Sequence, residues 1–175
     1  MPRGPKLRAS PMGHPFRVVL VEPEIPPNTG AVARTCAATG SPLHLVGPLG
    51  FRIDAQAVRR AGLDYWHLVD LHRHDSLDDL RATHPDLRMH LFSAGASRSY
   101  LEADLRPGDA LVFGKESVGL PPEVLRAHAD RVWAIPTLGP VRSLNLSNAV
   151  AIVLYEALRR AGALARPFMA DDAVP

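Results

Sequence analysis

The sequence has one cysteine, few lysines and no long apolar run. Cys36 is the single cysteine, so no disulfide can form within the chain, as is usual in a reducing cytoplasm. The best apolar stretch, residues 148–158, ends at Arg159 and falls short of the ~18–20 residues that cross a bilayer. We therefore expect a cytoplasmic protein that lies outside the membrane.

Several common catalytic motifs are also missing. No G-x-G-x-x-G follows the first expected strand, so an ordinary dinucleotide-binding or Rossmann-type methyltransferase site is not indicated. The P-loop, the H-E-x-x-H helix and a C-x-x-C pair are absent. His72 and His74 flank Arg73, but no cysteine or carboxylate stands at ligand spacing, so we interpret them as part of a solvated loop. We expect no metal centre.

The charge pattern permits RNA binding without locating it. The net charge is only +2, but of the 20 basic residues only Lys6 and Lys115 are lysines. The guanidinium group of arginine can form two parallel hydrogen bonds to one phosphate. A coding bias toward arginine explains the same ratio, so the composition identifies no phosphate site.

The 175 residues, 46% of them hydrophobic, suffice for one domain with its own core. Short β-branched runs alternate with helix-like segments, which predicts an α/β fold with a mostly parallel sheet. The expected strands are 16–21, 43–46, 65–69, 89–92, 110–113 and 131–135. The expected helices are one capped by Asn28 and ending near Gly40, then 54–61, 76–83, 121–128, and a last one capped by Ser147 that ends before Gly162. Residues 1–15 read as a basic flexible tail, 16–162 as the single domain and 163–175 as a flexible C-terminal tail.

Three loops of this pattern carry an unusual share of proline, glycine and polar residues. Residues 22–30 hold three prolines, which restrict the backbone before a helix N-terminus. Residues 113–121 follow a buried strand, and their glycines allow close backbone approach. Residues 135–147 bring polar side chains into the last helix, where capping explains at least one of them. Together the loops predict a polar pocket at one edge of the sheet.

The same loops carry a family resemblance. The segments E-P-E-I-P-P-N-T-G-x-x-x-R (22–34), R-R-A-G-L-D-Y (59–65), F-G-x-E-S-x-G-L-P (113–121) and R-S-L-N-L-S-N-A-V (142–150) follow one another in order. In these segments the chain resembles the SPOUT superfamily of RNA methyltransferases, and within it the TrmL-type 2′-O-methyltransferases of the tRNA wobble nucleotide. The resemblance covers about residues 16–162.

The resemblance implies a fold and an activity that spacing alone does not reveal. It implies a SPOUT fold, in which the C-terminal part of the α/β domain forms a deep trefoil knot, although knots are rare. It implies a homodimer that binds S-adenosyl-L-methionine and tRNA. The expected reaction is methylation of the 2′-hydroxyl of nucleotide 34, a cytidine or modified uridine, in leucine tRNAs.

Individual roles follow from the same resemblance. Arg34 is expected to orient the attacking ribose hydroxyl and stabilise its developing negative charge, because a group with a pKa above ~12 is a poor base. The remaining expected catalytic residues are Arg142, which contacts the site or an RNA phosphate, and Asn145. The cofactor pocket is expected to contain Ala94, Gly114, Ile135 and Ser143. Asn28 and Glu116 are expected to be supporting residues, and for Glu116 and Asn145 a scaffold role is as compatible with the pattern as direct chemistry.

Some positions depart from the family pattern. Lys115 stands where proline is common, Val118 where a basic residue is common, and Ala31 where asparagine is common. Residues 93–98 also differ from a threonine-rich, lysine-bearing stretch. These departures leave two alternatives open: a SPOUT enzyme that methylates another tRNA or rRNA ribose, or an RNA-binding module that has lost catalysis. Mapping of the methylated nucleotide distinguishes the first alternative from a wobble-nucleotide enzyme. Absence of S-adenosylmethionine binding would favour the second alternative.

Overall fold

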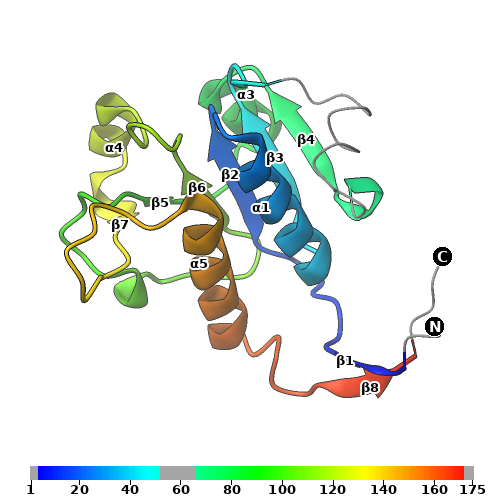
Figure 1. Cartoon of the computed structure of the whole chain (residues 1–175). Coiled ribbons are helices and arrows are strands. Elements are labelled where there is room, and N and C mark those ends of the chain that lie inside the picture. The colour runs from blue at the N-terminus through cyan, green and yellow to red at the C-terminus, as the bar shows by residue number, and fades with distance from the viewer. Residues whose placement is uncertain (1–3, 52–65, 172–175) are drawn as a thin grey trace.

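A computed structural model describes residues 4–51 and 66–171 of the chain. Its centre is a six-stranded parallel sheet with the order β4-β3-β2-β6-β5-β7 (Figure 1). The strands are β2 (Arg17–Val21), β3 (Leu43–Val46), β4 (Leu71–His74), β5 (Met89–Phe92), β6 (Ala110–Phe113) and β7 (Val132–Trp133). The predicted α/β class and mostly parallel sheet are confirmed.

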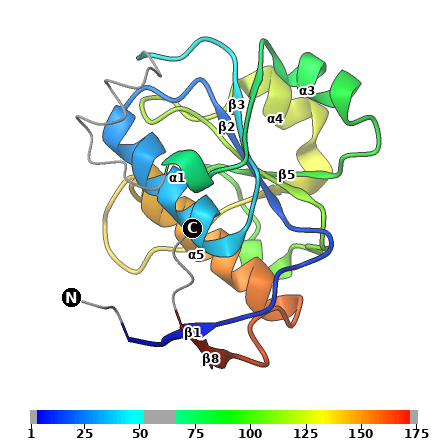
Figure 2. The same cartoon turned by 90° about the vertical axis from the view of Figure 1, so that its right-hand side faces the viewer.

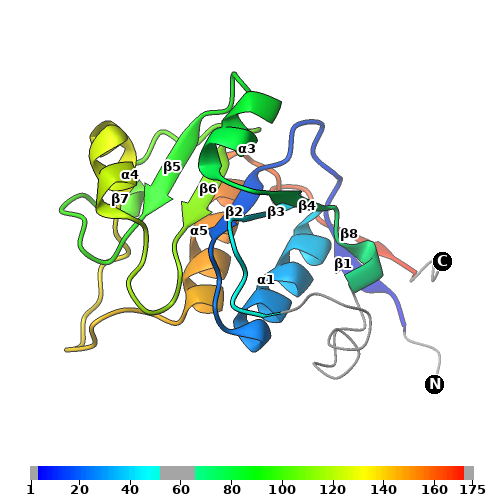
Figure 3. The same ribbon diagram turned by 90° about the horizontal axis from the view of Figure 1, so that it is seen from above.

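Helices cover both faces of this sheet. Helices α1 (Pro26–Thr39) and α5 (Leu146–Arg160) contact each other on one face, and α3 (Leu77–Thr83) and α4 (Pro122–Ala127) lie on the other (Figure 3). Every residue of β3, β5 and β6 is buried, as expected for a parallel sheet covered on both faces. Short 3₁₀ helices, η1 (Trp66–Leu68), η2 (Tyr100–Glu102) and η3 (Ala129–Arg131), lie in the connections.

Two helix starts differ from the predicted ones. Helix α1 begins at Pro26, with Ile25 as its N-cap, so Asn28 lies inside the first turn. Proline suits the first helical positions because it has no N–H to satisfy there. Helix α5 is capped by Asn145, whose side chain accepts hydrogen bonds from the N–H groups of Ser147 and Asn148. The predicted caps Asn28 and Ser147 are therefore wrong.

The predicted strand at 65–69 is also wrong. Residues Trp66–Leu68 form η1, and the edge strand β4 follows at Leu71–His74. Only His74 of β4 is buried, so the hydrophobic pattern that marks an interior strand is missing from this edge. Strand β7 is shorter than predicted, and the predicted helix at 54–61 lies outside the described residues.

A two-stranded antiparallel ribbon lies in the two terminal segments. Strand β1 (Lys6–Arg8) pairs with β8 (Phe168–Ala170), and Leu7 faces Met169 across the ribbon. The ribbon lies below helix α5, apart from the main sheet (Figures 1 and 2). This pairing was not predicted, because three-residue strands give no periodicity.

Two further findings bear on reactivity and location. Burial raises the pKa of the Cys36 thiol to about 12, so this cysteine stays protonated and unreactive. Among residues 4–51 and 66–171 no helix has both the length and the apolar character that a membrane crossing requires.

Histidines cluster at the β3–β4 edge of the sheet. His44 is fully buried on β3, and its Nδ1 lies 2.9 Å from Nε2 of His74 on β4. The ring of His44 stacks on that of His72, with 4.7 Å between centroids. The expectation that His72 and His74 belong to a solvated loop is therefore wrong, and no group of metal-ligating side chains is found among the described residues.

The buried imidazole of His44 makes stability depend on pH. Burial, with smaller contributions from His72, Arg17, His74 and His84, lowers its pKa from 6.5 to about 3. Between these two values the unfolded chain binds the proton and the folded chain does not, so stability falls as the pH drops below 6.5. We expect the free energy of unfolding to fall by about 2 kcal/mol between pH 7 and pH 5 through this group.

Urea unfolding of His44→Gln and of wild type at both pH values measures this contribution. The variant should lose less stability than wild type on acidification, while His67→Gln, at an exposed position, should behave as wild type. An equal fall in wild type and His44→Gln would show that His44 does not carry the effect.

Candidate active site

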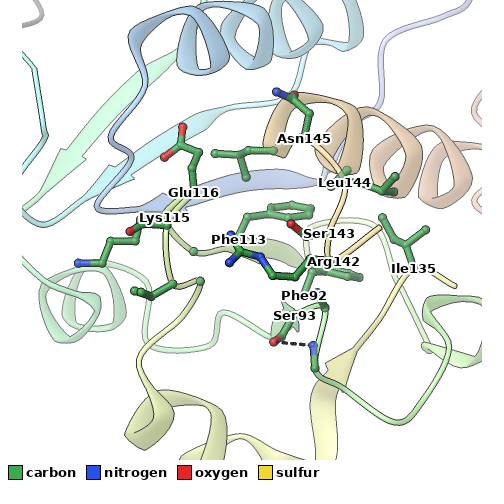
Figure 4. A pocket seen from close by; sticks show the side chains of 18 of the residues that line it. Phe92, Ser93, Phe113, Lys115, Glu116, Ile135, Arg142, Ser143, Leu144 and Asn145 are labelled. Carbon is green, nitrogen blue, oxygen red and sulfur yellow. Dashed lines mark hydrogen bonds between the residues drawn. The ribbon is translucent and has the colours of Figure 1, made fainter. Parts of the chain in front are cut away.

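A cavity of about 730 Å³ lies where strands β5, β6 and β7 end. Its walls come from the loops that follow these strands and from the first turns of α1 and α5 (Figure 4). Phe92 and Phe113, the last residues of β5 and β6, stack with 4.9 Å between ring centroids. Both the volume and the mixture of apolar walls with a few polar groups are typical of a small-molecule site.

The loop after β6 crosses itself closely at Gly114. A Cβ atom there would overlap the backbone of Gly119 and Leu120. Gly119 has a φ of +75°, and its N–H donates to the carbonyl of Lys115 at 2.9 Å. Gly114 therefore leaves room for the close crossing, and Gly119 adopts a left-handed backbone conformation that would strain a residue with a side chain.

Glu116 anchors this turn to the beginning of α1. Its Oε2 accepts from the backbone N–H of Glu24 at 2.8 Å, and its Oε1 accepts from the N–H of Ile25 at 3.2 Å and from Nδ2 of Asn28 at 3.0 Å. A carboxylate at a helix N-terminus also interacts favourably with the helix dipole. Since these donors occupy both oxygens, the arrangement favours the supporting role expected for Glu116.

Asn28 links Glu116 to Asn145. The Nδ2 of Asn145 donates to Oδ1 of Asn28 at 3.0 Å, while its own Oδ1 accepts from Ser147 N at 2.9 Å. The three loops are thus joined by one chain of hydrogen bonds, Glu116–Asn28–Asn145. Both polar atoms of the Asn145 amide have protein partners, which favours positioning over direct chemistry.

Sequence reasoning missed two acidic residues that brace the same loops. Glu22 pairs with Lys115, with 2.8 Å between Oε2 and Nζ, and this contact raises the pKa of Lys115. Glu24 accepts from the N–H of Ser117 at 3.1 Å. The E-P-E segment was the available signal, because its two carboxylates follow a strand that neighbours the one before Lys115 in the parallel sheet.

Most of the expected site residues meet at the cavity. Its lining includes eight of them: Asn28, Ala94, Gly114, Glu116, Ile135, Arg142, Ser143 and Asn145. Arg34 is the exception. It lies exposed on α1 and does not line the cavity of its own chain.

The cavity loops lie within a stretch of sequence that matches a known family. The SpoU rRNA Methylase family matches residues 15–155. The chain belongs to this family. It is 49% identical over 156 residues to a tRNA (cytidine(34)-2′-O)-methyltransferase of Acidovorax sp. (strain JS42), a match that spans 87% of this chain and 96% of the relative.

Two solved structures are similar to this chain. One, from "Structural insights into the 2-OH methylation of C/U34 on tRNA", is 50% identical, with a TM-score of 0.78 over 84% of this chain and 96% of the other. The SpoU methyltransferase AviRb from Streptomyces viridochromogenes, in complex with AdoMet, is 25% identical. Its TM-score is 0.70, and the match covers 86% of this chain and 59% of the other.

Proposed function

We propose that the protein is an S-adenosylmethionine-dependent 2′-O-methyltransferase of the wobble nucleotide, position 34, of tRNA. The observation that carries the proposal is the cavity of about 730 Å³ that the three motif loops build in a SpoU methylase fold. The relative from Acidovorax sp., named for methylation of cytidine 34, supports the choice of nucleotide. Cytidine or a modified uridine of leucine tRNAs is the proposed target, and the cytoplasm is the proposed location.

The cavity fits S-adenosylmethionine. It is large enough for a bent nucleoside ligand, and three of its lining residues, Gly95, Gly114 and Gly119, have no side chain that would occupy it. The backbone of Ala94, Gly114 and Ile135 is proposed to hold the adenosine, with Ser143 as a polar contact. When bound, the cofactor supplies an electrophilic methyl group on a sulfonium sulfur.

Two arginines are proposed to act on the RNA. Arg142 lines the cavity and is exposed, so it can bind a phosphate beside the reacting ribose. Arg34 is proposed to reach the cavity of a second subunit in a homodimer. There its guanidinium would orient the 2′-hydroxyl and stabilise the oxygen as its proton leaves to a phosphate or water.

We also propose that the C-terminal part of the chain forms the trefoil knot of SPOUT proteins. The support is a crossing near β7: the N–H of Ser93 donates to the carbonyl of Trp133 on one side. On the other side the N–H of Ala134 donates to the carbonyl of Arg98, and the N–H of Tyr100 donates to the carbonyl of Ala134. A chain trace from crystals that runs outside the 93–109 connection would contradict the knot.

The basic residues of the N-terminal segment are proposed to add affinity for tRNA. We expect the double variant Lys6→Gln with Arg8→Gln to raise KM for tRNA by about tenfold at low salt, because each phosphate contact releases counterions on binding. KM for S-adenosylmethionine should stay unchanged. Arg106→Gln, at a position where the side chain pairs with Asp104, serves as the matched control, and equal KM values for tRNA in all three proteins would contradict the role.

Incubation of total tRNA with the enzyme and methyl-labelled S-adenosylmethionine tests the proposed function. Nuclease digestion and mapping should place the label on the ribose of nucleotide 34 in leucine tRNAs. Label on another ribose would identify a different RNA target. Absence of both methylation and cofactor binding would contradict the proposal and favour the RNA-binding module that has lost catalysis.

A further inference from the structure

A buried series of polar contacts runs from the amino end of β6 to the wall of the cavity. Trp133, at the end of β7, lines the cavity and donates its indole N–H to Nδ1 of His90 at 3.1 Å. The Nε2 of His90 lies 3.2 Å from Oδ2 of Asp109. His90 is 1% exposed and Asp109 4%. None of these three residues belongs to the family motifs.

The contacts determine the proton positions in this chain. The indole of Trp133 can only donate, so Nδ1 of His90 accepts and its proton is on Nε2, which donates to Asp109. The carboxylate of Asp109 also accepts from the backbone N–H of Arg106 at 2.8 Å. It forms an ion pair with Arg88, whose Nε lies 3.5 Å from Oδ1 and whose Nη2 lies 3.4 Å from Nε2 of His90. Each member therefore has a defined partner, and Trp133 is held in one orientation.

Trp133 in turn supports the loop that carries Ala94. The guanidinium carbon of Arg98 lies 4.2 Å from the centroid of the Trp133 ring. The Nη2 of Arg98 donates to the carbonyls of Asp130 and Ala129 at 2.5 and 3.2 Å. Residues 93–98 are thus attached to Trp133 at their C-terminal end, and the backbone of Ser93 is bonded to the carbonyl of Trp133 at the other end.

We propose that His90 is a positioning residue for the cofactor: it orients Trp133 and, through Arg98, the Ala94 wall of the cavity. The inference rests on the proposed function, because it assigns this wall to S-adenosylmethionine. A buried polar chain is costly to leave partly unsatisfied. Loss of the acceptor at Nδ1 therefore releases the indole, and the effect falls on cofactor affinity while the tRNA contacts stay intact.

Two substitutions of similar size separate the two nitrogens of His90. In His90→Asn the amide oxygen stands where Nδ1 was and can accept from Trp133. In His90→Gln the longer amide reaches the position of Nε2 and keeps the bond to Asp109 but offers Trp133 no acceptor. His90→Leu removes both hydrogen bonds. If the Leu variant does not fold, the comparison of the Asn and Gln variants still shows whether the bond to Trp133 controls cofactor affinity.

Titration calorimetry with S-adenosylmethionine, with steady-state kinetics beside it, gives the first readout. We expect His90→Gln to weaken cofactor binding by about tenfold, and His90→Asn to remain within about threefold of wild type. KM for tRNA and kcat should be unchanged in both. Equal affinity in wild type, Asn and Gln variants would overturn the inference, as would losses of equal size in Asn and Gln.

The indole proton of Trp133 gives a readout that needs no cofactor. In a Trp66→Phe background, which leaves Trp133 as the one tryptophan, its NMR signal should exchange slowly in wild type and in His90→Asn, and faster in His90→Gln. Fast exchange in all three proteins would overturn the inference. Wild-type protein that binds no S-adenosylmethionine would overturn the proposed function as well, and the indole signal distinguishes that failure from the loss of the Trp133–His90 contact.

Discussion

Arg34→Ala is expected to reduce methyl transfer to background, a fall of at least about 10³-fold in kcat, while S-adenosylmethionine binds with wild-type affinity. The physical reason is the loss of the cation that orients the ribose hydroxyl and stabilises its negative charge. The residues proposed to hold the cofactor, Ala94, Gly114, Ile135 and Ser143, all line the cavity from other loops, so removal of the Arg34 side chain leaves these contacts in place. Single-turnover kinetics on tRNA and calorimetry with the cofactor measure the two effects separately.

Two further variants bracket this result. Arg34→Lys should recover only part of the rate, because an ammonium group lacks the planar fork of a guanidinium. Arg81→Ala, at an exposed position on α3, should retain wild-type activity. Turnover by Arg34→Ala equal to that of wild type would remove Arg34 from the proposed chemistry.

Gly114→Ala is expected to abolish cofactor binding. The added methyl group would overlap the backbone of Gly119 and Leu120, which are not flexible side-chain ends that can move aside. The loop after β6 must then open, and the cavity loses the turn that forms one of its walls. We expect no binding at concentrations a hundredfold above the wild-type dissociation constant, together with a lower Tm, because overpacking in a tight site costs about 1–3 kcal/mol.

Gly139→Ala is the matched control for this substitution. Gly139 belongs to another cavity loop, but a Cβ there meets no atom within 4 Å and its φ is not positive. Cofactor binding and Tm should both be unchanged. Wild-type cofactor affinity in Gly114→Ala would contradict the geometry of the crossing.

The parallel sheet was predictable because its interior strands are continuous buried runs. Residues 43–46, 89–92 and 110–113 are strands in the structure at the bounds that the sequence predicted. The edge strand β4 was harder to predict. In β4 only His74 is buried, and the nearby apolar residues at 65–69 drew the prediction to the wrong segment.

At the site, the loops were predictable from local sequence, but the contacts between them were not. The motifs identified the loops that form the cavity, because their prolines and glycines restrict the backbone in ways that sequence displays. The contacts that hold these loops together were not predictable, since Glu116 and Asn28 are 88 residues apart and Asn145 and Asn28 are 117 apart. The His90–Trp133 pair is also non-local, since its members are 43 positions apart in the sequence.

The central claim is that the cavity of one subunit works with Arg34 of the other, and a mixed dimer tests it most directly. Arg34→Ala and Gly114→Ala chains, each inactive alone, are coexpressed with different tags and the heterodimer is purified. One of its two sites then combines an intact cavity with an intact Arg34, so the account predicts methylation of nucleotide 34 at about half the wild-type rate per dimer. A heterodimer as inactive as its parents, or a monomeric active enzyme, would contradict it.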